Sequence, residues 1–289
     1  MDYKDSKWAQ KIIALQLNDG SWGDFHSLST ITPKQPITTE QALRRLKIFG
    51  YTLEDKPIKK ALNYLQNCLI GKTTIPDRVE KLHNWKIFTE LMLSVWIRIF
   101  SLDNRKANDI AEKWSIIINS AFESGKYDND KYISTYMKVL ELKPKGGRLL
   151  DFTSFYQISL LTNVLDKTIE PNYFEYILNH ESGIYYIYDK NINNFPKTFK
   201  SKETSRYISA IELLAKYENN NCKKQLYYVK KWLKSNMENE NKWDMGKESK
   251  DGIYLPLSDS WKKEEDRIKD CTYRINRLLK KIGTNCNFA

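Results

Sequence analysis

The chain has 289 residues, 41% of them hydrophobic and 13% aromatic, and this apolar content excludes a disordered chain. Lys and Arg number 47 against 36 Asp and Glu, so the formal net charge is +11, which favours anionic partners such as phosphate or an acidic membrane surface. The sequence has no basic tail and no aromatic RNA-binding motif, so we expect no nucleic-acid partner.

Apolar residues recur with the 3.6-residue period of amphipathic helices through nearly the whole chain. The expected helices cover residues 7–17, 38–49, 56–69, 79–101, 104–122, 129–142, 147–165, 171–180, 203–217, 222–237 and 262–282. Two segments that begin with or near a glycine, GIYYIYD from residue 183 and DGIYLPL from residue 251, are the candidates for short extended structure. The sequence therefore predicts an all-α protein.

The most apolar run, LMLSVWIRIF, is short and interrupted by Arg98, so we expect no transmembrane segment. The N-terminus shows no signal-peptide pattern. The four cysteines, Cys68, Cys222, Cys271 and Cys286, form no closely spaced pair and predict neither a disulfide framework nor a zinc site. Together these features predict a reduced, cytoplasmic setting.

The densest basic stretch is KKQLYYVKKWLK, residues 223–234. Its apolar residues Leu226, Val229, Trp232 and Leu233 share one helical face, so the lysines are expected to form a solvated outer face.

A short pattern, a glycine or asparagine followed two residues later by an aromatic, recurs about once per expected helix pair. Its copies are Gly20 with Trp22, Gly71 without an aromatic, Gly125 with Tyr127, Gly183 with Tyr185, and Asn241 with Trp243. Glycine and asparagine suit the left-handed backbone that ends helices, and the aromatic is expected to fold back on its own helix. Gln16, one turn before Gly20, is expected to bond free backbone groups at that helix end.

The first copy, QLNDGSW, resembles the Gln-Trp repeat of squalene and oxidosqualene cyclases and, more loosely, of protein prenyltransferase β subunits. The later copies are degenerate. The resemblance implies an (α/α) toroid of about five to six helical hairpins around a central cavity. We accordingly expect one domain over residues 1–289, with residues 244–289 closing or capping the ring.

The family's catalytic motifs are altered or missing in this chain. The segment YDNDKY resembles the acidic motif of the cyclases, but Lys131 follows Asp130, where it would favour the ionised carboxylate over the acid that protonates an alkene. A helix N-cap and a first-turn acid are the simpler interpretation of Asp128 and Asp130. Paired diphosphate-binding motifs and zinc-ligand spacing are also missing, so we expect no cofactor and no metal, with Mg²⁺ implied only by a bound diphosphate.

Three segments carry further candidate residues. Glu90 lies in a stretch, residues 82–100, that is apolar on nearly all sides, so it is expected either in an ion pair or as a cavity acid. A long tyrosine-rich connection before residue 203 contains Tyr185, Tyr188 and Asp189, and Arg206 follows it. Either this segment forms a ligand-binding loop, or it covers one end of the fold.

The last expected helix places Arg267, Asp270 and Arg274 on one face at three- and four-residue spacing, shortly after Trp261. Such a face is most often a solvated, mutually supporting surface. Alternatively it faces a cavity mouth, where the two arginines would bind a phosphate or carboxylate.

These observations lead us to expect a cyclase-like protein that binds a small apolar, isoprenoid-like or anionic ligand, with any catalysis diverged from that of the family. Asp130, Glu90 and Asp189 are the weak catalytic candidates, and the ligand-binding candidates are Tyr185, Tyr188, Arg206, Trp261, Arg267, Asp270 and Arg274. A carbohydrate-active (α/α) barrel, using acids among Glu90, Asp130, Asp189 and Asp259, is one alternative. A non-catalytic helical scaffold for a peptide or anionic partner is the other.

Overall fold

A computed structural model describes residues 3–141, 143, 149–238 and 241–283. Within these ranges the chain forms helices, turns and loops, and its only β-type pairings are isolated bridges. The predicted all-α class is confirmed. None of the helices in the described ranges is both long and apolar enough to span a membrane.

The chain divides into two compact units. The first comprises Met1–Trp114 with Tyr136–Asp151, and the second comprises Ser115–Thr135 with Phe152–Ala289. Helices α5 (Arg105–Ala121) and α6 (Asn129–Val139) each contribute residues to both units. The toroidal arrangement and the single domain closed by residues 244–289 stay predictions.

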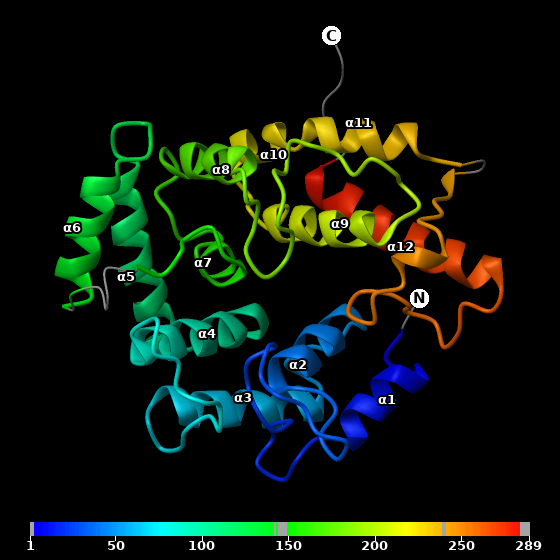
Figure 1. The fold of residues 1–289 in the computed structure, drawn as a ribbon, viewed down its shortest axis with the longest axis horizontal. Coiled ribbons are helices and arrows are strands. Elements are labelled where there is room, and N and C mark those ends of the chain that lie inside the picture. Colours follow the sequence, from blue (N-terminus) through cyan, green and yellow to red (C-terminus); the bar gives the residue numbers. More distant parts are fainter. Residues whose placement is uncertain (1–2, 142, 144–148, 239–240, 284–289) are drawn as a thin grey trace. The chain divides into compact units, whose positions relative to one another are not determined.

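The first unit contains α1 (Lys7–Ala14), α2 (Thr39–Ile48), α3 (Lys56–Leu69) and α4 (Trp85–Phe100), with parts of α5 and α6 (Figure 1). Helix α1 packs against α2, and α3 packs against α4. Polar side chains fix where these helices begin: Ser6 caps α1, Thr38 and Gln41 form a capping box on α2, and Asn84 caps α4.

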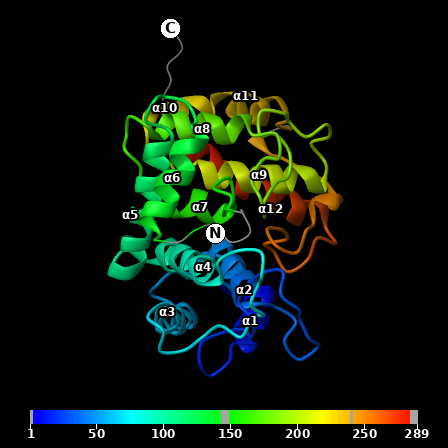
Figure 2. The ribbon, with the colours of Figure 1, turned by 60° about the vertical axis from the view of Figure 1, so that its left-hand side comes forward.

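The second unit contains α7 (Phe155–Leu160), α8 (Glu170–Asn179), α9 (Lys202–Leu214), α10 (Asn220–Gln225) and α11 (Tyr227–Ser235). The 3₁₀-helix η3 (Lys247–Ser249) and α12 (Glu264–Ile282) follow. Helix α8 packs against α10, α7 against α9, and α11 against α12. Helices α10 and α11 follow one another along one side of this unit (Figure 2), separated only by Leu226.

Most predicted helices are present within a few residues of their expected bounds. The helix expected at 79–101 begins only at Trp85, and the one expected at 222–237 is divided into α10 and α11. Residues 147–165 are the main exception. Only Phe155–Leu160 of that segment is helical. Before it, the Tyr185 N–H donates to the Thr153 carbonyl and the Phe155 N–H donates to the Tyr185 carbonyl. These two bonds flank the parallel bridge between Ser154 and Tyr185, and backbone paired in this way cannot continue a helix. After it, Asn163 adopts a positive φ of 59°, which ends the helical path.

The two candidate extended segments behave differently. GIYYIYD forms isolated bridges at Ser154↔Tyr185 and Ile184↔Tyr188 but no strand. Among the described residues, DGIYLPL has no bridge at all.

The backbone prediction for the five repeat positions is confirmed. Gly20, Gly71, Gly125, Gly183 and Asn241 all have positive φ, between 60° and 99°. Each of the four glycines donates its N–H to the carbonyl oxygen three residues earlier. The preceding helix ends two or more residues before each position, so these residues shape the turn after the helix rather than its last cap.

Two of the repeat aromatics fold back as predicted. The buried Trp22 donates Nε1–H to the carbonyl of Ile12 in α1 at 2.7 Å, and its backbone N–H donates to Thr39 Oγ1 in α2 at 2.9 Å. Trp243 makes the same pair of bonds, to the carbonyl of Leu233 at 2.7 Å and to Thr272 Oγ1 at 3.0 Å. We call these two arrangements the tryptophan clasps.

The prediction that Gln16 bonds to the end of its own helix is wrong. Its Nε2 donates to the carbonyls of Gly20 at 2.9 Å and of Pro57, in the first turn of α3, at 2.8 Å. Gly20 itself lies so close to α3 that an added Cβ would fall 2.4 Å from the Lys60 carbonyl oxygen. The first clasp therefore holds the turn after α1 against α2, while Gln16 and Gly20 hold the same turn against α3.

Candidate functional site

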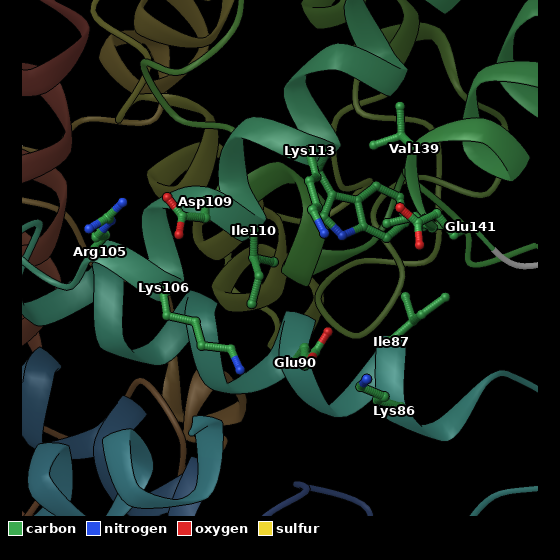
Figure 3. A pocket seen from close by; sticks show the side chains of 12 residues that line it. Lys86, Ile87, Glu90, Arg105, Lys106, Asp109, Ile110, Lys113, Val139 and Glu141 are labelled. Atoms are coloured by element: carbon green, nitrogen blue, oxygen red, sulfur yellow. The ribbon is translucent and has the colours of Figure 1, made fainter. Parts of the chain in front are cut away.

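A pocket of about 580 Å³ lies within the first unit (Figure 3), a volume ordinary for small-molecule sites. Helix α4 supplies Lys86, Ile87 and Glu90; helix α5 supplies Arg105, Lys106, Asp109, Ile110, Lys113 and Trp114; the end of α6 and the residues after it supply Val139, Leu140 and Glu141. The pocket thus combines an apolar wall with a charged rim.

The helical period of α5 produces this combination. Ile110 and Trp114 point inward four residues apart and are buried, whereas Lys106, Asp109 and Lys113 occupy the exposed side of the same helix. The Trp114 ring packs edge-on against Tyr136, with ring centroids 5.9 Å apart. The apolar wall is therefore a fixed part of the core.

The charged rim has four basic and three acidic side chains, so it carries a net positive charge. Among the described residues, none of these seven side chains makes a hydrogen bond or an ion pair. Figure 3 shows Lys106 extending from α5 toward Glu90 on α4. Glu90 is half-buried, while the other six charged side chains are exposed.

Of the predicted catalytic candidates, Glu90 lines this pocket. Asp130 lies in the second unit, exposed in the first turn of α6. Asp128 accepts hydrogen bonds from the backbone N–H groups of Asp130 and Lys131 at 3.0 Å, so the N-cap interpretation of this acidic pair is confirmed. Lys131 forms an ion pair with Glu123 at 2.7 Å.

The tyrosine-rich connection lies in the second unit. Tyr185 is 54% exposed, and its ring centroid lies 4.0 Å from that of Tyr186. The repeat pattern predicts that Tyr185 folds back on its own helix, and this prediction is wrong. Tyr188 is buried and donates its hydroxyl to Glu203 at 3.0 Å; burial and that carboxylate raise the pKa of the phenol. Asp189 and Arg206 are exposed.

The expected solvent exposure of the α12 face is wrong. Arg267 and Arg274 are each 5% exposed and Asp270 is fully buried. Arg267 binds Asp244 through two bonds, of 2.6 and 2.8 Å, and also binds Glu264 at 2.8 Å.

Arg274 crosses to α9, where it donates to both carboxylate oxygens of Glu212 and to the hydroxyls of Ser205 and Ser209. Its guanidinium is thus held by protein acceptors. Asp270 Oδ2 accepts from the backbone N–H groups of Leu257 and Ser258, from the Ser258 hydroxyl, and from Trp261 Nε1 at 2.8 Å. The predicted ligand-binding residues of α12 therefore all have structural partners.

Electrostatics on this face follow from the same contacts. Burial alone would raise the pKa of Asp244, but hydrogen bonds from Arg267 and from the Gly246 backbone N–H outweigh it and hold that pKa below its usual value. Burial is the main cause that raises the pKa of Cys271 to about 12, so this thiol stays protonated at neutral pH.

The described residues contain no cluster of three or more potential metal ligands. Two histidines that are distant in sequence, His26 and His83, both lie against Phe88, with ring centroids 5.9 and 6.0 Å from it. Cys68, Cys222 and Cys271 are free thiols, and Cys286 lies outside the described residues.

Sequence reasoning singled out Glu90 but missed the rest of the charged rim. The rim residues that it missed are Lys86, Arg105, Lys106, Asp109, Lys113 and Glu141. A signal was present in RKANDIAEKW, where charges at positions 105, 106, 109 and 113 flank the apolar Ile110 and Trp114. Spacing of this kind is common on solvated helices, so it points to a pocket only once α4 is placed opposite.

No protein-family model matches this chain, and comparison with curated proteins and with solved structures likewise found no match.

Proposed function

We propose that the pocket of the first unit binds a small ligand with an apolar body and an anionic group. The observation that carries this proposal is the set of seven charged rim side chains, net positive, that have no protein partner among the described residues. Charges with no partner in the protein are free to pair with a ligand. The apolar wall formed by Ile87, Ile110 and Trp114 would accept the ligand body.

The resemblance of QLNDGSW to the cyclase repeat supports an isoprenoid-like body for this ligand. The function proposed is binding, because the altered family motifs support no particular reaction. Of the four acids named for a carbohydrate-active enzyme, Glu90 alone lines the pocket, and that alternative gains no support from this site.

Thermal unfolding with and without ligand tests the proposal. The ligands are farnesyl diphosphate, farnesol and inorganic diphosphate, each with and without Mg²⁺, beside a short oligosaccharide. A ligand at one hundred times its dissociation constant stabilises the native state by about 2.7 kcal/mol, which raises the midpoint by several degrees in a protein of this size. We expect a shift with farnesyl diphosphate that exceeds those with farnesol and diphosphate.

If inorganic diphosphate shifts the midpoint as much as farnesyl diphosphate does, the apolar wall has no part in binding and the proposal reduces to an anion site. If the oligosaccharide alone shifts the midpoint, the carbohydrate alternative replaces it. If no ligand shifts the midpoint, the proposal fails and the scaffold alternative takes its place.

A further inference from the structure

The outer face of α10 and α11 is the most basic helical surface of the second unit. Residues 220–235 contain Lys223, Lys224, Lys230, Lys231 and Lys234 and no acidic residue. None of these five lysines forms an ion pair with a described carboxylate. We call these five side chains the lysine face.

The groups next to α11 do not neutralise this charge. Lys230 Nζ donates to the carbonyl of Gly283 at 3.0 Å, next to the last turn of α12, which carries Lys280 and Lys281. The acid that follows α11, Glu238, is engaged by Lys200 at 2.8 Å. Along residues 220–235 an anionic partner therefore meets five lysines and no acid, and the exposed Glu218 lies just outside this stretch, two residues before α10.

Exposed apolar groups accompany the lysines. Met237, in the turn that follows Lys234, is 40% exposed. Tyr227 lies on the lysine side of α11, with the ammonium groups of Lys230 and Lys231 within 5.8 and 5.5 Å of its ring centroid. The opposite face of α11, with Val229 and Leu233, is fully buried in the core.

We propose that the lysine face docks the protein on the surface of an anionic lipid bilayer. Lysines near such a surface each contribute attraction to acidic headgroups, and a tyrosine and an exposed methionine suit the interfacial region. The buried face of α11 stays in the core, so docking is peripheral and electrostatic rather than by helix insertion.

The same features disfavour single-stranded nucleic acid as the partner. Such binding combines a basic groove with aromatic rings open for base stacking. Here the lysines lie on the outer face of two helices, α10 and α11, and the ring of Tyr227 is already flanked by two ammonium groups.

Vesicle co-sedimentation tests the proposal on the full chain, using phosphatidylcholine vesicles with and without phosphatidylserine, at low and high salt. The test variant is K224Q/K231Q/K234Q. The matched control is K34Q/K72Q/K81Q, which removes the same charge from exposed lysines of the first unit. Circular dichroism and the unfolding midpoint of each variant establish that it folds.

We expect the wild type to bind only the phosphatidylserine vesicles and to be released by salt. Each lysine near the surface is worth about fivefold in partitioning, so the test variant should lose about a hundredfold while the control loses far less. M237S, measured at low salt where the wild type is bound, should give a smaller loss than the triple lysine variant.

Equal loss in the two triple variants would show that net charge alone acts, and would overturn the proposal. Absence of binding to phosphatidylserine vesicles by the folded wild type would overturn it as well. Release from vesicles by a single-stranded oligonucleotide at equal phosphate concentration would assign the surface to nucleic acid instead.

Discussion

The charged face of α12 and the charged rim of the pocket carry similar residues at similar spacing, yet their surroundings differ. On α12, Arg267, Asp270 and Arg274 are buried, and each is held by several protein partners. Around the pocket, the rim side chains are mostly exposed and have no such partner among the described residues. Helical spacing alone does not separate a structural charge from a free one; the element that packs opposite does.

Helix α9 explains the difference. It presents Ser205, Ser209 and Glu212 to α12, four and three residues apart, so that its acceptors match the fork of the Arg274 guanidinium. Opposite α5, helix α4 presents Ile87 and Glu90, which leave the cations of α5 without a matching set of acceptors.

The largest effect should come from removing one partner of the α12 network. Arg274→Met leaves the Ser205 and Ser209 acceptors unmet and Glu212 without its cation, so it should destabilise the protein by about 3–5 kcal/mol. Urea unfolding followed by circular dichroism measures this change. Arg206→Met, at an exposed arginine of α9, is the control and should cost less than about 0.5 kcal/mol. A loss at Arg274 as small as that at Arg206 would contradict a structural role.

The second clasp ties the segment that follows α11 to α11 itself and to α12. Trp243→Phe removes the Nε1–H donor and leaves the Leu233 carbonyl without it, which should cost about 2 kcal/mol. Trp22→Phe removes the equivalent bond to Ile12 in the first unit. We expect similar losses from both in urea unfolding, since the two clasps share the same geometry. If only one of the two variants loses stability, the two clasps share their geometry but not their contribution to the unfolding free energy.

Acidification should weaken the α12 network specifically. The folded pKa of Asp244 lies below its unfolded value of about 3.9, so its stabilising contribution is complete above that value and is lost as pH falls through the folded pKa. We expect unfolding free energy to fall on acidification below about pH 4, and Asp244→Asn to remove part of that dependence. Denaturant unfolding of the wild type and of Asp244→Asn at a series of pH values from 7 downward gives the unfolding free energy of each as a function of pH. If the two free energies fall equally with pH, the prediction is wrong.

Local sequence signals predicted the elements well because they depend on neighbouring residues. Ser6, Thr38 and Asn84 cap the helices that apolar periodicity predicts, and the glycine and asparagine turns have the expected positive φ. The failure at residues 147–165 has a long-range cause, since the pairing of Ser154 with Tyr185 joins positions far apart in the chain.

The site was harder to predict for the same reason. Glu90 was recognisable as a charge in an apolar helix, but Lys106 and Lys113 differ in no local way from solvated lysines. Arg274 likewise lies on a face of the kind that is usually exposed, and only the serines and Glu212 of α9 bury it. Which charges are free depends on tertiary neighbours that periodicity does not specify.

The smallest effect on stability, and the one that sharpens the comparison most, is expected at the pocket. Neutralising Lys86, Lys106 and Lys113 together as K86Q/K106Q/K113Q removes side chains that make no bond to any described residue. We expect unfolding free energy to change by less than about 0.5 kcal/mol per site, as at other surface positions. The farnesyl diphosphate shift should nevertheless fall sharply, whereas K34Q/K72Q/K81Q, with the same loss of charge, should keep it. A stability loss on the scale of Arg274→Met would show that these lysines are structural, and the difference between the two regions would disappear. An unchanged ligand shift in a stable triple variant would mean instead that the rim is free but unused.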